Sequence, residues 1–273
     1  MAAQKPLMMP TGLSSLDPVL EGGIPQGSVV LLLADIGAGN REFVHSSVLS
    51  ISSPDRKAGP GEVLPSGIRY VTFTKKKDDI LQEITLSFHP DLARGLGQIQ
   101  FIDLSEQYFD SSIVPVRWYS QENLVDRLQR HRETGSVLGE LTAQLEKGGR
   151  NVLFVLDSLT EIGVHYAATP RWNELTAFLR GLQRVTKDRD STVYLLLTRG
   201  ILDPQRELEI ADTADAVILF RWEETTGMRR QRVMYFEKFR GLMPHLEEND
   251  LVKFAVRITA GGGFEVSNIR VVI

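Results

Sequence analysis

Short apolar runs alternate with longer amphipathic stretches between residues 29 and 220. The apolar runs, rich in Val, Leu, Ile and Phe, predict strands at Val29–Leu33, Tyr70–Phe73, Ile99–Ile102, Val152–Leu156, Val193–Leu197 and Ala216–Phe220. The amphipathic stretches predict helices at Glu42–Ser50, Lys77–Phe88, Gln121–Glu133 and Trp172–Lys187. Such alternation is typical of a mainly parallel β-sheet flanked by helices. The fold class predicted for this region is therefore α/β.

The pattern changes after Phe220, where apolar runs follow one another without helical stretches between them. Residues 231–241, 251–259 and 263–273 are typical of strands, and we expect them to extend the same sheet in antiparallel fashion. A length of 273 residues suits one large α/β domain, so we interpret residues 1–273 as a single domain.

Composition narrows the classes of chemistry. The chain has no Cys, which excludes disulfides, thiolate nucleophiles and cysteine-based zinc sites. The five His residues lie far apart without metal-ligand spacing, and we interpret them as ordinary surface or core residues. A net charge of −4 gives no general attraction to nucleic acid, and the basic runs at 74–79 and 227–232 are typical of solvated turns. Nucleic acid is thus a less favoured partner than protein.

No segment is long and apolar enough to span a bilayer, and the N-terminus lacks the apolar stretch of a secretory signal. We therefore expect a cytoplasmic protein.

The first candidate site follows the strand at Val29–Leu33. A turn containing Gly37 and Gly39 leads into a helix, which is the context of a phosphate-binding P-loop. Asn40 and Arg41 stand where that motif has Lys followed by Ser or Thr. Asn40 carries no charge for the phosphates, and Arg41 has no oxygen for a metal ion. Taken alone, the stretch is equally consistent with an ordinary turn between a strand and a helix.

A second candidate site is the end of the strand at Val152–Leu156, where Asp157 and Ser158 follow four or more apolar residues. This is the form of a Walker B strand, whose Asp orders the water shell of a magnesium ion. A strand that ends in Asp-Ser also often caps a turn. The order and separation of the two stretches favour the nucleotide-site interpretation.

Residues 11–40 resemble the opening of the RecA-like ATPases of the KaiC type, a family that includes many archaeal proteins. The positions that match the family's pattern before the loop are Thr11, Gly12, Leu16, Asp17, Gly22, Gly23, Ile24, Pro25, Gly27 and Ser28. The resemblance continues through Asp157 and residues 210–220 to residues 236–241, and covers about residues 8–265. It implies a RecA-like parallel sheet with nucleotide at the carboxyl ends of the strands.

The resemblance also implies a set of cofactor-binding residues. These are Gly37, Ala38, Gly39, Asn40, Arg41, Glu42, Asp157, Ser158, Lys238 and Arg240. The implied cofactors are ATP or ADP with Mg²⁺, for which Asp157 is the implied metal ligand. Arg41 is equally consistent with a phosphate ligand and with a solvent-exposed arginine.

The family's catalytic glutamates, which follow the second strand, are missing here. Thr74 and Lys75 stand in their place, and neither can accept the proton of an attacking water. Asp78 and Asp79 lie four residues further on, where we expect them to cap the next helix. No catalytic residue is therefore predicted.

The stretch at 236–241 resembles the segment that KaiC-type subunits project towards a neighbour's nucleotide. Lys238 and Arg240 are two residues apart on a predicted strand, so they share one face. The other interpretation is the polar face of an edge strand, where Lys also discourages aggregation. The resemblance implies a homo-oligomer or a protein partner.

With the phosphate lysine, the magnesium hydroxyl and the general base all replaced, the sequence predicts a pseudo-ATPase, catalytically inactive or only weakly active, that acts as a regulatory or scaffolding subunit and retains some nucleotide affinity. One alternative is an active ATPase in which Arg41 binds phosphate and Asp78, Asp79 or Glu161 is the base. The other is a RecA relative that binds nucleic acid through basic loops.

Overall fold

The computed structural model describes residues 6–110, 112–120, 136–225 and 229–268. Within these residues a nine-stranded sheet runs through the molecule in the order β11-β10-β9-β8-β3-β7-β6-β4-β5. Its strands are β3 (Val29–Ala34), β4 (Gly67–Thr72), β5 (Ile99–Asp103), β6 (Val152–Asp157), β7 (Thr192–Thr198), β8 (Ala216–Thr225), β9 (Arg229–Phe239), β10 (Lys253–Thr259) and β11 (Gly263–Asn268). A small antiparallel pair, β1 (Met8–Met9) with β2 (Ile24–Pro25), precedes them. The strands from β8 to β5 are parallel, and β9, β10 and β11 are antiparallel additions.

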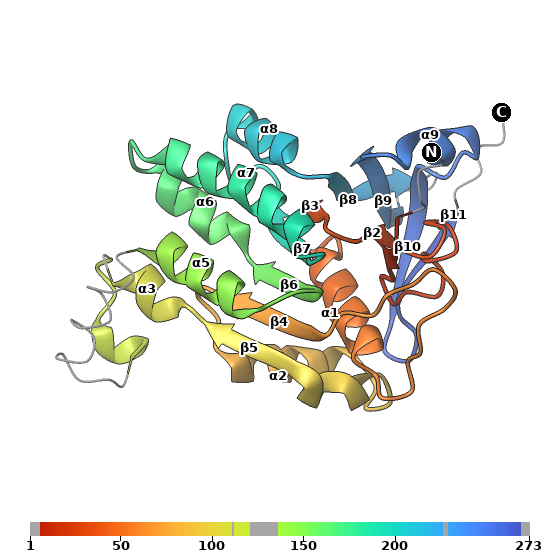
Figure 1. Ribbon diagram of the computed structural model, residues 1–273, viewed down its shortest axis with the longest axis horizontal. Helices are drawn as coiled ribbons and strands as arrows, with labels where there is room; N and C mark the ends of the chain where they lie inside the picture. The colour runs from red at the N-terminus through yellow and green to blue at the C-terminus, as the bar shows by residue number, and fades with distance from the viewer. Residues whose placement is uncertain (1–5, 111, 121–135, 226–228, 269–273) are drawn as a thin grey trace.

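Helices cover both faces of the parallel part of the sheet. They are α1 (Asn40–Ile51), α2 (Lys77–Ser87), α3 (Ser105–Phe109), α5 (Val137–Lys147), α6 (Leu159–Ala167), α7 (Trp172–Asp188), α8 (Pro204–Thr213) and α9 (Met243–Glu248), with short 3₁₀ turns at Leu92–Gln98 and Val116–Trp118. Figure 1 shows α5, α6 and α7 on one side of the sheet and α2 on the other. The arrangement is the helix–sheet–helix layering expected of βαβ units.

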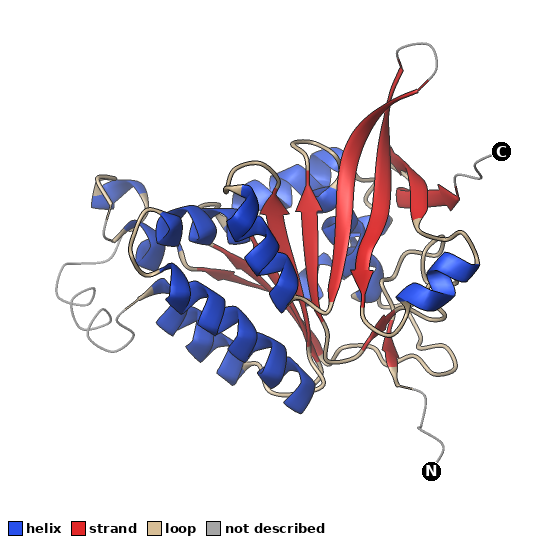
Figure 2. Cartoon of the chain, turned by 90° about the horizontal axis from the view of Figure 1, so that it is seen from above, coloured by secondary structure: helices blue, strands red, loops and turns tan. Residues whose placement is uncertain are grey.

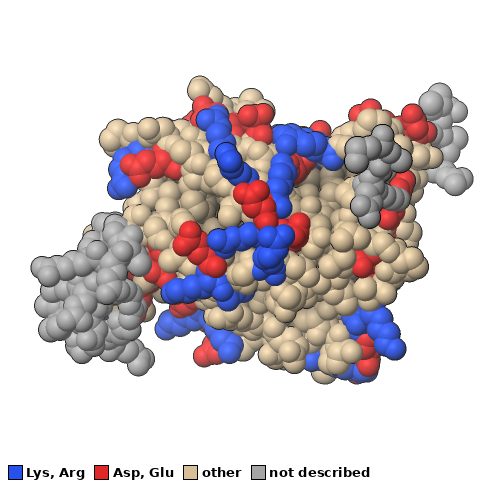
Figure 3. All heavy atoms as spheres, viewed as in Figure 1, with Lys and Arg blue, Asp and Glu red and all other residues tan. Residues whose placement is uncertain are grey.

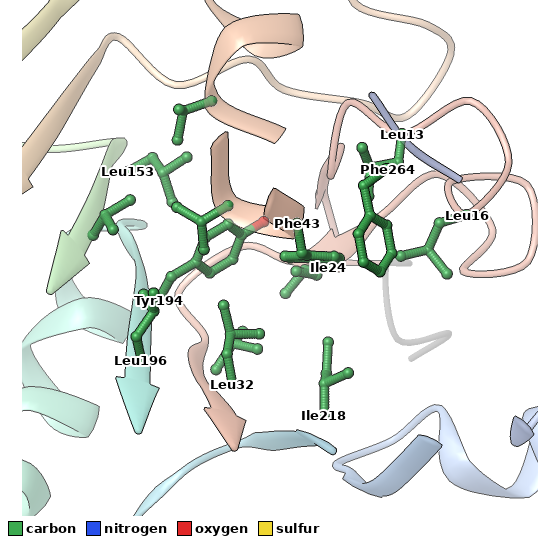
Figure 4. Close-up of a cluster of buried hydrophobic side chains, with 14 of the residues drawn as sticks. Leu13, Leu16, Ile24, Leu32, Phe43, Leu153, Tyr194, Leu196, Ile218 and Phe264 are labelled. Atoms are coloured by element: carbon green, nitrogen blue, oxygen red, sulfur yellow. The ribbon is translucent and has the colours of Figure 1, made fainter. Parts of the chain in front are cut away.

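The two hydrophobic cores follow from the alternation of side chains along each strand. On β3, Val30 and Leu32 face a core with α1 and α2, whereas Leu31 and Leu33 face a core with α5 to α8. Because both faces are covered, the entire strand is buried, as the continuous apolar run predicts. Figure 4 shows the first of these cores, in which Phe43 of α1 lies among side chains from the central strands and the C-terminal strands.

The antiparallel C-terminal strands complete the sheet. Strand β8 is parallel to β3 over Ala216–Phe220 and then continues with β9 as a long hairpin. Figure 2 shows this pair of strands projecting beyond the rest of the sheet. The hairpin passes beside the turn between β3 and α1, and it therefore borders the candidate site.

The fold class and the strand positions predicted from the pattern are confirmed, except that residues 269–273 of the last predicted strand lie outside the described residues. Three of the predicted helices are present as α1, α2 and α7, while the predicted helix at Gln121–Glu133 lies outside the described residues. The prediction of a solvated turn at 227–232 was wrong for residues 229–232, which belong to β9, and residues 227 and 228 lie outside the described residues. Among the described residues, no helix is long and apolar enough to cross a membrane.

Candidate functional site

The glycine turn lies at the carboxyl end of β3, where it joins α1. Gly37 has φ of 72° and Gly39 has φ of 112°, a region that strongly favours glycine. A Cβ atom at position 39 would also lie 3.2 Å from the Cδ1 atom of Ile258. Ala38, between the two glycines, is fully buried. The turn therefore needs glycine at these two positions and is held close to the C-terminal strands, and its Ala38 N–H donates to the carbonyl of Asp35 at 3.0 Å.

The β8–β9 hairpin fixes the turn from one side. The indole Nε1 of Trp222 donates to the carbonyl of Ile36 at 3.1 Å, and Nε of Arg232 donates to the carbonyl of Gly37 at 3.1 Å. The guanidinium of Arg232 stacks over the Trp222 ring at 4.5 Å from its centre. These contacts support the turn through its carbonyl groups without using its N–H groups.

The two residues that replace the motif's Lys and Ser/Thr contact the protein itself. The amide of Asn40 donates to the carbonyl of Leu32 at 3.4 Å, so it points back to the end of β3. Nη2 of Arg41 donates to Oδ1 of Asp157 at 2.9 Å, which joins the first turn of α1 to the end of β6. The structure thus brings the two candidate stretches together through a direct ion pair.

Asp157 is the centre of a buried polar network. Its second oxygen accepts from the hydroxyl of Tyr70 at 2.9 Å, and His45 lies 3.2 Å from the same hydroxyl. Because the single Tyr70 proton goes to Asp157, His45 must donate its Nε2–H to the Tyr70 oxygen. Both carboxylate oxygens of Asp157 therefore already have donors within the protein.

The ionisation of this network is fixed by burial and by Arg41. Burial raises the pKa of the Asp157 carboxyl, but the charge and hydrogen bond of Arg41, with help from Tyr70, hold it below its usual range. Burial and, as the second largest cause, the negative charge of Asp157 raise the pKa of the Tyr70 hydroxyl well above its ordinary value. Burial lowers the pKa of His45 to about 4. At neutral pH the network holds one carboxylate, one guanidinium, a neutral phenol and a neutral imidazole.

A second ion pair continues the network onto α2. Oε1 of Glu83 lies 3.9 Å from Nε of Arg41, and Oε2 accepts from Nζ of Lys75 at 3.0 Å. Lys75 stands where the resemblance places one of the catalytic glutamates. Its ammonium group therefore balances Glu83, and the two carboxylates of this region face two cations.

The sequence did not predict the roles of Tyr70, His45, Glu83 and Lys75 in this network. Tyr70 lies 87 residues from Asp157 along the chain, and no local motif marks their contact. The periodicity of α1 placed His45 on a helix but could not indicate a polar partner on β4.

A small pocket opens beside the turn. Its volume is about 130 Å³, and its lining residues are Ala34, Asp35, Ile36, Gly37, Asn40, Arg41, Ser158, Leu196, Leu197 and Thr198. Pockets that enclose a ligand of nucleotide size usually measure roughly 300–1,000 Å³. The space suits a phosphate-sized group better than an entire enclosed nucleotide.

The remaining residues of the candidate set lie around this pocket or cap helices. Glu42 lies in the first turn of α1 and is half-buried. Ser158 caps α6, where its hydroxyl and backbone N–H both bond to Glu161. Asp79 caps α2, as expected, by accepting from the backbone N–H of Lys76 at 3.3 Å. Two of the candidate bases, Asp79 and Glu161, thus hold helix N-termini.

Lys238 and Arg240 lie at the other end of the parallel strands, where β9 ends beside the start of β8. Phe239, between them, pairs with Ala216 at the start of β8, whereas the turn follows Ala34, which pairs with Phe220. The two sites are therefore roughly 13 Å apart along the strand direction. Within the chain, Lys238 and Arg240 do not reach the turn.

Each of these two cations has partners in its own subunit. Nζ of Lys238 donates to the carbonyls of Ala211 and Asp212 at the end of α8, at 3.1 Å and 2.9 Å. Arg240 donates to Oδ1 of the buried Asp215 at 3.1 Å, although more than half of its side chain is exposed. Figure 3 shows Lys and Arg side chains lying beside Asp and Glu on the face of Figure 1, rather than as a field of one sign.

Comparison with known proteins identifies the fold. No protein-family model matches the sequence, and no curated protein matches it. A solved structure, that of a KaiC-like protein from the hyperthermophilic archaeon Pyrococcus horikoshii OT3, superposes with a TM-score of 0.58 over 95% of this chain and 98% of that chain. The chain has a KaiC-like RecA fold. The sequences are 18% identical, so the likeness concerns the KaiC-like fold and not its chemistry.

A magnesium ion does not fit the donors present at Asp157. Mg²⁺ is bound through one or two carboxylates and its waters, but the charge of Asp157 is already balanced by the Arg41 guanidinium at Oδ1, and Tyr70 donates to Oδ2. The residues that the structure describes contain no group of three or more His, Cys, Asp or Glu that could hold a metal ion.

Proposed function

We propose that this chain is a KaiC-like RecA domain that does not hydrolyse ATP and that acts as a regulatory or scaffolding subunit. The observation that carries the proposal is the ion pair between Arg41 and Asp157, with 2.9 Å between Nη2 and Oδ1. In a P-loop ATPase the metal and its water shell occupy the neighbourhood of this Asp. Here a guanidinium group holds the carboxylate directly.

The second requirement of hydrolysis is a base that accepts a proton from the attacking water. Lys75, at the position of a family glutamate, is an ammonium group bonded to Glu83. Asp79 and Glu161 are held in caps of α2 and α6. Loss of the base and of the metal together removes contributions of several kcal/mol each to lowering the barrier, which supports the absence of turnover.

Nucleotide binding without hydrolysis remains part of the proposal. ATP or ADP would be held by its phosphates at the turn of Gly37, Ala38 and Gly39, beside Asn40 and Glu42. The backbone form of the turn and the phosphate-sized pocket support this role. Because the motif's lysine is absent, we expect the affinity to be low.

A regulatory or scaffolding role requires association with another chain. RecA-like domains commonly build their sites between subunits, so we propose a homo-oligomer in which Lys238 and Arg240 lie near the contact. The exposure of Arg240 supports this position. The contacts of Lys238 with α8 indicate that this residue also stabilises its own subunit.

Phosphate release from ATP in the presence of Mg²⁺ tests the proposal. The matched control is Asp157→Asn, which keeps the size of the side chain and removes its charge. We expect the two proteins to release phosphate equally slowly. Magnesium-dependent turnover in the wild-type protein that disappears in Asp157→Asn would show that the chain is an active ATPase.

A further inference from the structure

The guanidinium of Arg41 occupies a position that joins three elements. From the first turn of α1 it reaches Asp157 at the end of β6 and approaches Glu83 on α2. The Asp157 side chain is only 2% exposed, whereas that of Arg41 is 33% exposed. A buried carboxylate is thus neutralised from the pocket side by a side chain of the same protein.

The charges of this cluster balance without an added ion. Arg41 and Lys75 supply two positive charges, and Asp157 and Glu83 supply two negative charges. A divalent cation at Asp157 would leave an excess of positive charge beside a guanidinium that it had displaced. Removing one member of a buried pair is costly because the other charge is left without a partner.

The donors around Asp157 also oppose metal binding. Tyr70 directs its hydroxyl proton at Oδ2 and Arg41 directs an N–H at Oδ1, so each oxygen faces a hydrogen atom. Arg41 itself has no atom that could coordinate a cation. A metal ion at Oδ1 would have to lie beside or displace the positively charged guanidinium that already neutralises the carboxylate.

We propose that the Arg41 guanidinium takes the place of a divalent cation at Asp157. It links α1 to the end of β6 through Asp157 and to α2 through Glu83, a contact region that we call the α1–β6–α2 junction. This junction therefore forms without Mg²⁺ and binds no Mg²⁺. This inference rests on the proposed function for its setting, since it concerns the same site. In the metal-free protein all contacts of the junction are already formed, and any phosphate ligand at the turn binds independently of magnesium.

Metal binding can be measured directly on the wild-type protein. Mn²⁺ is a suitable probe, because the electron paramagnetic resonance signal of the free aqueous ion is lost when the ion binds to a protein. Binding of Mg²⁺ can be followed by titration calorimetry. We expect neither ion to bind in a manner that depends on Asp157. Binding of either ion to the wild-type protein that is lost in Asp157→Asn would overturn the inference.

Thermal melting of an arginine variant tests whether Arg41 stabilises the junction. Arg41→Ala should lower the Tm in EDTA, and Mg²⁺ should then raise the Tm of this variant but not that of the wild-type protein. The matched control is Arg199→Ala, which removes a half-exposed arginine from Asp35 at the rim of the same pocket. Its Tm should not respond to Mg²⁺. An unchanged Tm for Arg41→Ala in EDTA would show that the guanidinium does not hold the junction and would contradict the inference.

The two proposals can fail separately. Hydrolysis of ATP without metal binding at Asp157 would refute the proposed function and leave the role of Arg41 intact. Metal binding at Asp157 without hydrolysis would refute the role of Arg41 alone. If Arg41→Ala does not fold, the metal titration of the wild-type protein still decides the question.

Discussion

Mild acid should destabilise this protein through one buried residue, His45. Burial lowers its pKa from an ordinary value of 6.5 to about 4, and its side chain bonds to Tyr70 in the neutral form. Glu83 and Asp157 favour the charged imidazole, whereas Arg41 and Lys75 oppose it, and none of these outweighs burial. His45 should therefore stay neutral in the folded state across the range in which it gains a proton in the unfolded state.

The sign and size of the effect follow from proton linkage. Between pH 6.5 and about 4 the unfolded chain binds a proton at this residue that the folded chain does not, so stability is fully present above this range and falls as the pH is lowered through it. The full difference between the two pKa values of His45, 6.5 and about 4, corresponds to about 3 kcal/mol of unfolding free energy. Between about pH 7 and about pH 5 the loss from His45 should be about 2 kcal/mol.

Urea unfolding at these two pH values measures the effect. The comparison protein is His45→Gln, whose amide can donate to Tyr70 but does not titrate. The other titratable groups are common to both proteins, so the difference between their two pH dependences isolates His45. Equal losses of unfolding free energy in the two proteins, or a pKa near 6.5 for His45 by NMR titration, would refute the reasoning.

Other predictions concern the ion pair, the turn and assembly. Arg41→Ala should lower the free energy of unfolding by about 3 kcal/mol in denaturant titrations, the lower end of the range for breaking a buried pair, because Arg41 is partly exposed. Gly39→Ala should destabilise the protein by about 2 kcal/mol and Gly37→Ala by about 1 kcal/mol, because both have positive φ but only at position 39 would a Cβ atom lie close to a neighbour, 3.2 Å from Cδ1 of Ile258. Light scattering should give a mass above the 30.6 kDa of one chain, and a strict monomer at high concentration would contradict the proposed assembly.

The strands could be predicted because their chemistry is local. Runs such as Val152–Leu156 are apolar on both faces, and no other structure buries such a short run as well as a central parallel strand. The helices α6 and α8 were missed although they carry start signals. Ser158 and Glu161 form a capping box, and Asp203 caps α8 just before a proline. Ser158 directly follows β6, where the strand-end motif already accounts for it, whereas Asp203 lies in the connection after β7.

The candidate site was predictable only in part, for a different reason. Glycines at the turn and an Asp at a strand end have recognisable local contexts. The choice between phosphate and solvent for Arg41 depends on Asp157, which lies 116 residues further along the chain. The structure shows a third partner, a carboxylate of the protein itself. Such a contact is set by the packing of α1 against the sheet, which single-sequence patterns do not contain.

The substitutions at positions 40, 41 and 75 are consistent with one coordinated change rather than three independent losses. A lysine at position 40 beside Arg41 would add a third cation to a cluster that is already neutral. Asn40 instead bonds to Leu32 and leaves the Arg41–Asp157 pair undisturbed. With Arg41 paired to Asp157, a neutral residue at position 40 is the compatible choice.

Changes at positions 40 and 41 should strengthen the proposed nucleotide site. The double variant Asn40→Lys with Arg41→Thr should bind ATP with Mg²⁺ at least about tenfold more tightly than the wild-type protein, because a charge-assisted contact contributes about 1.5–3 kcal/mol. Asn40→Lys alone should gain much less, since Arg41 still covers Asp157, and the two changes should therefore be non-additive. Calorimetric titration of all four proteins forms the complete cycle. Additive affinities would show that positions 40 and 41 act independently, and an unchanged affinity in the double variant would show that the turn no longer accepts a nucleotide. Hydrolysis should stay slow in every variant, because Lys75 still occupies the position of the base.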